Sequence, residues 1–272
     1  MLALRLAALS VVLACAAIGV AACGFGGLAS RSDDGADSGG TSRGGREAGD
    51  DLDASSSDAQ SLPDGGTVVL DDAALPPELS LHVTTAPAMV DLEAEGTLAW
   101  QHWGKGDENS RNEKSTAKGA IPTWTVSNTG DVRTFDDFLT TFRWTNGSPN
   151  ATESGTQRGV YAKFDGPPSS KPKLTLAFKV GVERRRLVIY AGTYRSKGHF
   201  AVTLSSPGSM KTVFQDIDSA SDLVNDKAYG RFAIDYRGAA PMADLVVTWE
   251  IATSYDDNNA NITLCAATMM PR

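Results

Sequence analysis

Residues 173–180 read KLTLAFKV, a segment in which apolar side chains alternate with polar or small ones. Successive side chains on a β-strand point to opposite faces, so Leu174, Leu176 and Phe178 would all lie on one side. The pattern therefore predicts a strand with one face in a hydrophobic core.

The same alternation recurs through the rest of the C-terminal half. It appears in residues 185–192, 199–204, 231–236, 244–251 and 262–266. Shorter strands are expected at residues 83–85, 89–94, 97–103, 138–144 and 158–164. Turn-forming residues separate these runs, and the best helical candidate is a single turn at residues 219–225. Roughly ten strands without sustained helical periodicity predict an all-β fold, an antiparallel β-sandwich of the jelly-roll type.

A different composition precedes the predicted strands. Residues 24–66 are mainly Gly, Ser and Asp, with too little apolar surface to offset the entropy of ordering the chain. They hold nine acidic and three basic residues, net −6, whereas residues 67–272 hold 24 and 21, net −3. The nearly balanced domain lacks the basic footprint of a nucleic-acid-binding protein. We expect a signal peptide at 1–22, a disordered acidic linker at 23–78 and the β-sandwich at 79–272.

The N-terminus has the pattern of an export signal. Arg5 precedes an apolar run at residues 6–22, whose length suits a signal peptide or a short membrane span. Residues 20–23, VAAC, resemble the bacterial lipobox. In that family the cysteine thiol is diacylated, the signal is cut before it, and the new amino group is acylated. The resemblance implies lipidation of Cys23, and the alternative is an ordinary secretory signal cut near residue 22 or 29.

Lipidation of Cys23 implies an anchor in the lipid bilayer and a place in the cell envelope. Gly24 stands where an Asp would indicate inner-membrane retention in Gram-negative lipoproteins, so the outer membrane is expected if the source is Gram-negative. Cys15 lies in the predicted signal peptide, which leaves Cys265 as the one thiol of the domain. A single cysteine forms no intrachain disulfide, so we expect Cys265 to pack as a small buried hydrophobe. We expect the protein to be a monomer.

Several segments of the domain resemble those of a known module. They are residues 90–104, 142–147, 186–192, 245–249 and 261–268, which read VDLEAEGTLAWQHWG, FRWTNG, RLVIYAG, LVVTW and NITLCAAT. Together they resemble the galactose-binding-like jelly-roll modules of secreted bacterial proteins, which often accompany glycoside hydrolases. The resemblance spans residues 85–270 and implies a fold rather than a particular ligand.

Catalytic signatures are absent from the predicted domain. Residues 79–272 contain neither the G-x-S-x-G nucleophile motif nor the H-E-x-x-H zinc motif, and the three histidines, His82, His102 and His199, are far apart. A Ser-His-Asp site or a carboxylate pair for glycoside cleavage could still be assembled from distant residues. We expect no enzymatic activity, with a hydrolase acting on glycans as the alternative.

One loop is rich in oxygen donors. Residues 256–259, Asp-Asp-Asn-Asn, offer side chains of the kind that calcium binds, with Asp256 and Asp257 as candidate ligands. Asp and Asn are also the ordinary residues of a hairpin turn, and the spacing matches no known calcium loop. We favour the turn, expect no cofactor and keep a structural calcium ion as the alternative. One domain cysteine and scattered histidines give no zinc pattern.

Tryptophans are the first candidates for a ligand site, because sugar-binding sites pair a flat aromatic ring with polar side chains. Trp249 alternates with apolar residues and is expected in the core, whereas Trp100 and Trp103 would point to opposite faces. Trp103 and Trp124 flank the polar loop at residues 105–118 and are the best candidates for exposed rings. The predicted ligand site consists of Trp103, Trp124, His102, Asn109, Arg111 and Lys114. The alternative is that all five tryptophans pack in the core.

Arg184, Arg185 and Arg186 form a basic run at the start of a predicted strand. Such a run meets an acidic partner or protects an edge strand from pairing. We favour protection of an edge.

These observations predict a membrane-anchored extracytoplasmic lipoprotein with a non-catalytic β-sandwich. Its expected ligand is a polysaccharide or another molecule of the cell surface, bound by loops at one end of the sandwich. The alternatives are a hydrolase acting on glycans and a structural or adhesive lipoprotein with no small ligand.

Overall fold

The computed structural model describes residues 76–128, 131–165, 171–221 and 225–272. The predicted signal peptide, Cys23 and the linker up to residue 75 lie outside these residues. The described strands begin with β1 (Glu78–Thr85) and end with β17 (Asn261–Pro271). Within the described ranges, no helix is long and apolar enough to cross a membrane.

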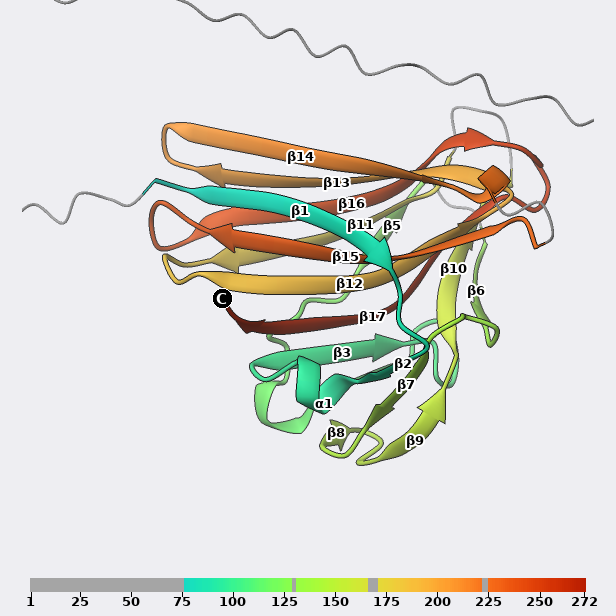
Figure 1. Ribbon diagram of the computed structural model, residues 1–272, viewed down its shortest axis with the longest axis horizontal. Helices are drawn as coiled ribbons and strands as arrows, with labels where there is room; N and C mark the ends of the chain where they lie inside the picture. The colour runs from blue at the N-terminus through green and yellow to red at the C-terminus, as the bar shows by residue number, and fades with distance from the viewer. Residues whose placement is uncertain (1–75, 129–130, 166–170, 222–224) are drawn as a thin grey trace, which may run out of the picture. The chain divides into compact units, whose positions relative to one another are not determined.

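The largest sheet has nine strands (Figure 1). Its main order is β1, β15 (Lys227–Arg237), β12 (Arg185–Tyr194), β17, β3 (Ala99–Trp103), β4 (Arg111–Lys114) and β8 (Gly147–Ser148), with β10 (Gly159–Lys163) and β6 (Val132–Phe135) as a branch. The branch arises because β17 pairs with β10 over residues 261–264 and with β3 over residues 266–269. Between these stretches the register against β12 shifts by one residue at Cys265, which forms a β-bulge.

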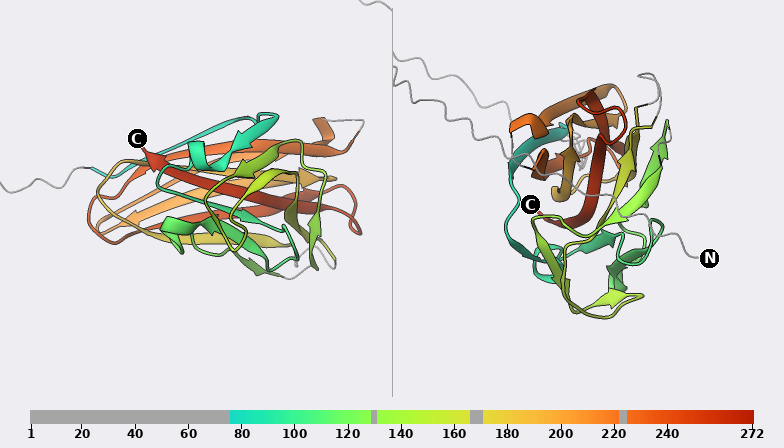
Figure 2. Two further views of the ribbon diagram at one scale, coloured as in Figure 1. Left: turned by 90° about the horizontal axis from the view of Figure 1, so that it is seen from below. Right: turned by 90° about the vertical axis from the view of Figure 1, so that its right-hand side faces the viewer.

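A five-stranded sheet packs against one face of the nine-stranded sheet (Figures 1 and 2). Its order is β14 (Ser209–Asp218), β13 (Ser196–Ser206), β16 (Ala243–Ser254), β11 (Lys173–Val180) and β5 (Thr125–Ser127), all antiparallel. Apolar side chains of the alternating runs meet between the sheets, where Phe200 stacks on Phe232 at 4.0 Å and Trp249 packs beside both. The predicted antiparallel β-sandwich and the predicted burial of Trp249 are confirmed.

A third layer covers part of the other face of the nine-stranded sheet. It consists of β2 (Met89–Asp91), α1 (Leu92–Glu95), β7 (Thr141–Trp144) and β9 (Glu153–Thr156). Beneath it lies a second core, in which Phe142 of β7 contacts Tyr190 of β12 at a ring distance of 5.2 Å. As a result, residues 187–193 of β12 are all buried, on both faces of the sheet.

Residues 92–94, expected as part of a strand, belong to α1 instead. The Asp91 carboxylate accepts hydrogen bonds from the backbone N–H groups of Glu93 and Ala94, at 3.1 and 3.2 Å, and so caps the helix. At the other end, Glu95 accepts from the Tyr190 hydroxyl at 2.8 Å, which attaches α1 to the sheet. The predicted helical turn at residues 219–225 is a 3-10 helix, η3, at Ser219–Ser221.

Three further expectations are wrong. The polar loop at residues 105–118 contains β4 and a 3-10 helix, η1 (Ser115–Ala117). Arg186 lies on β12, which has a neighbour on each side, so it protects no edge; it pairs instead with Asp235 at 2.6 Å. The bulge at Cys265 turns Ala266 into the second core, away from the face that its period-two pattern assigned to it.

Candidate functional site

The predicted aromatic site does not form an exposed surface. Trp103 is only 1% exposed, and Trp124 is half-buried against the main core. Trp100 and Trp103 do point to opposite faces of β3, but Trp100 packs in the second core and Trp103 in the main core. Because layers cover both faces of β3, the expectation that Trp103 is exposed is wrong.

The other predicted ligand residues divide between the interior and the surface. His102 is completely buried, and Lys114 is held by Glu93 at 2.8 Å and by the Gly96 carbonyl at 3.1 Å. Asn109 and Arg111 are exposed, and the Arg111 guanidinium donates to the Thr123 hydroxyl. The six residues therefore share no single surface, and ligand binding by Asn109 and Arg111 stays a prediction.

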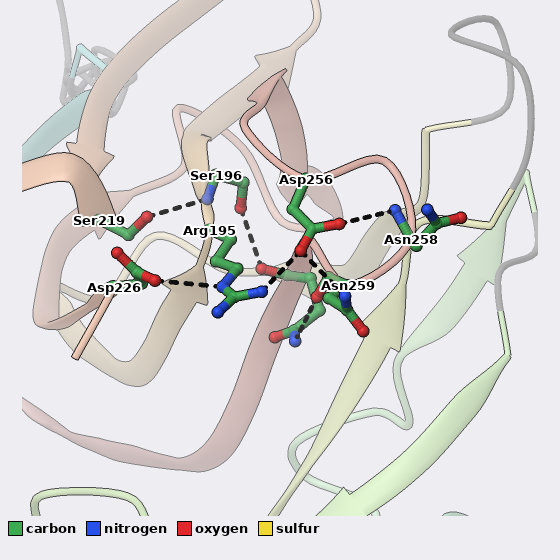
Figure 3. A network of polar contacts seen from close by, with 8 residues as sticks. Arg195, Ser196, Ser219, Asp226, Asp256, Asn258 and Asn259 are labelled. Atoms are coloured by element: carbon green, nitrogen blue, oxygen red, sulfur yellow. Dashed lines mark hydrogen bonds and ion pairs between the residues drawn. The ribbon is translucent and has the colours of Figure 1, made fainter. Parts of the chain in front are cut away.

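The oxygen-rich loop is organised around an arginine. Arg195 donates to the Asp256 carboxylate at 2.7 Å, and the Asn259 side-chain amide donates to it at 2.9 Å (Figure 3). These two bonds and the Asn258 backbone N–H lower the pKa of Asp256 to about 2. Among the described residues, no group of three or more His, Cys, Asp or Glu side chains could hold a metal ion. Residues 256–259 thus form the turn that the sequence favoured, with Asp256 bound to Arg195.

A cavity of about 430 Å³ lies on the outer face of the nine-stranded sheet, where β10 branches from β17. Four half-buried aromatic side chains from β6, β10, β12 and β15 line it, and we call them the aromatic cradle: Phe135, Tyr161, Tyr194 and Tyr229. The polar part of the lining consists of Asp137, Asn225, Lys227, Asn261 and Thr263. This volume is in the range of pockets that bind small molecules.

Strand register places part of the lining in one row across four strands. Tyr161 of β10 pairs with Thr263 of β17, which pairs with Gly192 of β12, which pairs with Tyr229 of β15. Directly paired residues share a face of an antiparallel sheet, so this row projects into the cavity. A Cβ atom at Gly192 would lie 2.2 Å from Cδ1 of Tyr229, so the tyrosine ring occupies the space above the glycine.

A second row lies beside the first. Asn261 of β17 pairs with Tyr194 of β12, and Tyr194 pairs with Lys227 of β15. The Lys227 ammonium forms an ion pair with Asp137, which belongs to the segment between β6 and β7. This pair places a donor and an acceptor at the rim of the cavity.

Neighbouring rings hold the cradle in position. Phe138, which is buried in the second core, lies 4.4 Å from the Tyr229 ring and 6.3 Å from the Phe135 ring. The Phe135 ring in turn lies 6.3 Å from Tyr161 in an edge-to-face arrangement. A ligand that stacks here meets rings that are already positioned, which reduces the entropy cost of binding.

Two oxygens of the lining have unused hydrogen-bonding capacity. Thr263 is 4% exposed, and neither its hydroxyl nor the side-chain carbonyl oxygen of Asn261 has a partner among the described residues. A buried polar atom without a partner costs about 1–3 kcal/mol, so a ligand hydroxyl that satisfied it would be favoured. Burial, together with the charge of Asp137, raises the pKa of the Tyr229 hydroxyl, which remains a neutral donor at physiological pH.

The arrangement can stack flat molecules and exchange hydrogen bonds with their hydroxyls. Sequence reasoning missed every residue of the cradle, because it searched for tryptophans beside polar loops. The available signal was three tyrosines in or next to predicted strands, Tyr161, Tyr194 and Tyr229. Such a signal is weak by itself, since tyrosines are common in strands.

No protein-family model matches the chain, and no curated protein matches it. Among solved structures it resembles TmCBM61 in complex with beta-1,4-galactotriose, at 11% identity and a TM-score of 0.32, over 58% of this chain and 95% of that one. It also resembles the K1 cleaved adhesin domain of Lys-gingipain from Porphyromonas gingivalis W83, at 15% identity and a TM-score of 0.35, over 64% and 98%. A third is a carbohydrate-binding module of the β-sandwich superfamily with promiscuous specificity, at 9% identity and a TM-score of 0.30, over 72% and 99%. The two packed antiparallel sheets described above establish the fold of this chain.

Proposed function

We propose that this protein is a non-catalytic carbohydrate-binding β-sandwich whose ligand occupies the aromatic cradle. The observation that carries the proposal is one cavity that combines four half-buried rings with the buried, unpartnered oxygens of Thr263 and Asn261. Sugars present C–H faces that stack on aromatic rings and hydroxyls that both donate and accept hydrogen bonds. The cradle offers both kinds of contact.

The register suggests how a sugar ring would sit. Tyr161 and Tyr229 lie at the two ends of a row whose middle positions are Thr263 and Gly192, and the Tyr229 ring lies over Gly192. A pyranose placed over Thr263 would meet the Tyr161 ring on one side and the Tyr229 ring on the other. Lys227 and Asp137 would then reach hydroxyls at the edge of the sugar.

The same lining does not favour glycoside cleavage. Among the described residues that line the cavity, Asp137 is the one carboxylate, and it is paired with Lys227. Most glycosidases need two carboxyl groups roughly 5–9.5 Å apart, one of them acting as an acid. The cavity therefore supports binding better than hydrolysis.

Thr263→Val tests the proposal, because it removes the unpartnered hydroxyl and keeps the shape of the side chain. We expect affinity for the bound glycan to fall about three- to tenfold, the effect of one neutral hydrogen bond. The free energy of unfolding should stay the same or rise, because a buried polar atom is lost. The purified full-length protein would be tested against galactan, cellulose, xylan and mannan by affinity electrophoresis, with thermal unfolding measured in parallel.

Tyr161→Ala provides the matching loss of a ring, and Phe214→Ala is its control. Phe214 is an aromatic residue of β14, 66% exposed and on the five-stranded sheet. Binding should weaken in Tyr161→Ala and stay unchanged in Phe214→Ala. Failure of the wild-type protein to bind any of the polysaccharides, or equal losses in both variants, would contradict the proposal.

We further propose that Cys23 carries the acyl anchor that holds this domain at the cell envelope, in the outer membrane if the source is Gram-negative. The lipobox-like residues 20–23 and the acidic linker that follows them support this proposal. Cys23→Ser should abolish acyl labelling and release the protein from membranes. Cys15→Ser is the control and should change neither, and retained labelling in Cys23→Ser would refute the anchor.

A further inference from the structure

A second cavity, of about 440 Å³, contains an aromatic ring of its own. Its lining consists of Arg195, Ser219, Ala220, Asp226, Tyr255 and Asp256. Tyr255 is 48% exposed, and its hydroxyl is held by the Asp218 carboxylate at 2.9 and 3.0 Å. An exposed ring fixed in position beside polar groups is the combination that also characterises the aromatic cradle.

Tyr194 and Arg195 join the two cavities. Tyr194 lines the cradle, and the Arg195 guanidinium, which lines the second cavity, lies 5.1 Å from the centroid of the Tyr194 ring. The backbone N–H of Tyr255 donates to the Arg195 carbonyl at 2.9 Å, so the two residues are neighbours at the second cavity. The stacked side chains of Tyr194 and Arg195 therefore link one cavity to the other.

Arg195 is fixed more firmly than an ordinary surface arginine. Its guanidinium lies between Asp226, at 3.1 Å, and Asp256, at 2.7 Å (Figure 3). The backbone of Arg195 has φ of 47° and that of Asp226 has φ of 55°, conformations that disfavour non-glycine residues. Such conformations persist only where surrounding contacts stabilise them, and they concentrate at ligand sites. A planar guanidinium held in this way gives a ligand a preformed surface.

The charged residues that line the two cavities indicate whether a neutral or an anionic glycan would bind. Among the described residues that line the second cavity, Arg195 is the one cation, and it pairs with the carboxylates of Asp226 and Asp256. In the cradle, Lys227 is neutralised by Asp137. A polyanionic glycan would meet uncompensated negative charge, whereas a neutral one would not.

We propose that the ligand is a linear, neutral glycan that occupies the aromatic cradle and the second cavity at the same time, crossing over Arg195. The inference rests on the proposed function, because it takes the cradle as a carbohydrate site. A disaccharide would fill the cradle alone, whereas a longer chain would also stack on Tyr255. Affinity should therefore increase with chain length until both cavities are filled.

Tyr255→Ala tests the second cavity, and Phe214→Ala, which removes an exposed ring elsewhere, is its control. The full-length protein would be titrated calorimetrically with the disaccharide and hexasaccharide of β-1,4-linked galactose, glucose, xylose and mannose. We expect Tyr255→Ala to weaken hexasaccharide binding about fivefold, the contribution of one aromatic contact, and to leave disaccharide binding unchanged. Phe214→Ala should bind both as the wild type does, because Phe214 lies on β14 and lines neither cavity.

The outcomes separate this inference from the proposed function. If the hexasaccharide binds no more tightly than the disaccharide, or if Tyr255→Ala binds the hexasaccharide like the wild type, the ligand does not span both cavities. Either result, with binding lost in Tyr161→Ala, overturns the inference and leaves the cradle as the binding site. If Tyr161→Ala and Thr263→Val bind like the wild type, the proposed function itself fails.

Discussion

Mild acid should lower the free energy of unfolding of the wild type because of His102, and His102→Leu should remove this effect. His102 is completely buried in the second core, 5.2 Å from the Trp144 ring and 5.6 Å from the Phe142 ring. Neither of its ring nitrogens has a hydrogen-bond partner among the described residues. Burial in these surroundings lowers the pKa of His102 from 6.5 to about 3, because the charged imidazolium would be desolvated there.

The size and sign of the effect follow from proton linkage. Between pH 6.5 and about 3 the unfolded chain binds a proton at this histidine and the folded protein does not, so acid favours unfolding. The free energy of unfolding falls by about 1.4 kcal/mol for each pH unit in that window, which amounts to about 2 kcal/mol at pH 5. Above pH 6.5 the contribution of His102 is constant.

Urea unfolding of the wild type and His102→Leu at several pH values measures this contribution. Carboxylates such as Asp256 titrate in both proteins, so the difference between their unfolding free energies isolates His102. That difference should shift by about 2 kcal/mol in favour of the variant between pH 7.5 and pH 5. His82→Leu, which replaces an exposed histidine of β1, controls for the loss of a histidine as such. Parallel pH profiles for the wild type and His102→Leu would refute the reasoning.

Three further predictions concern single sites. Gly198→Ala should lower the free energy of unfolding by about 1–3 kcal/mol, because its Cβ would lie 2.0 Å from Cη2 of Trp249; an unchanged urea midpoint would contradict this. Gly192→Ala should weaken glycan binding, measured by calorimetry, because its Cβ would displace the Tyr229 ring; wild-type affinity would show that the ring's position is unimportant. The Cys265 thiol is buried, and burial raises its pKa, so it should resist thiol reagents until urea unfolds the protein; mass spectrometry of labelled peptides detects any early reaction.

The main core is the part of the structure that the sequence predicts best. Each strand of the sandwich has one face in this core, so its period-two pattern is visible without any knowledge of its partners. Leu174, Leu176 and Phe178 of β11 lie there as the alternation indicates, and so does Trp249 of β16. These assignments depend on local sequence alone, which is why they are correct.

The third layer could not be predicted in the same way. Its strands β2, β7 and β9 are short, and β2 pairs with β7 in parallel across an interval of some fifty residues. It also alters the interpretation of the strands beneath it, because a strand covered on both faces loses its simple alternation. Trp100 and Trp103 illustrate this: the expected opposite orientation is correct, but each face of β3 meets a core instead of solvent.

The cradle was beyond sequence reasoning because it depends on register and on where the third layer ends. Tyr161, Thr263 and Tyr229 become neighbours only through the pairing of β10, β17, β12 and β15. At the Cys265 bulge, the partner of β17 changes from β10 to β3. On the outer face of the sheet, the second core covers one side of this point and the cavity lies on the other.

The second core and the cradle are therefore continuous. Phe138 is fully buried, yet it contacts both Phe135 and Tyr229, which are half-buried and line the cavity. Rings at the open end of a core have one part packed and another part accessible, which is the condition that stacking on a ligand requires. Contacts that hold the third layer against the sheet thus also position the cradle, so a glycan bound at Tyr229 should stabilise that layer against unfolding by an amount that rises with the logarithm of the ratio of glycan concentration to Kd.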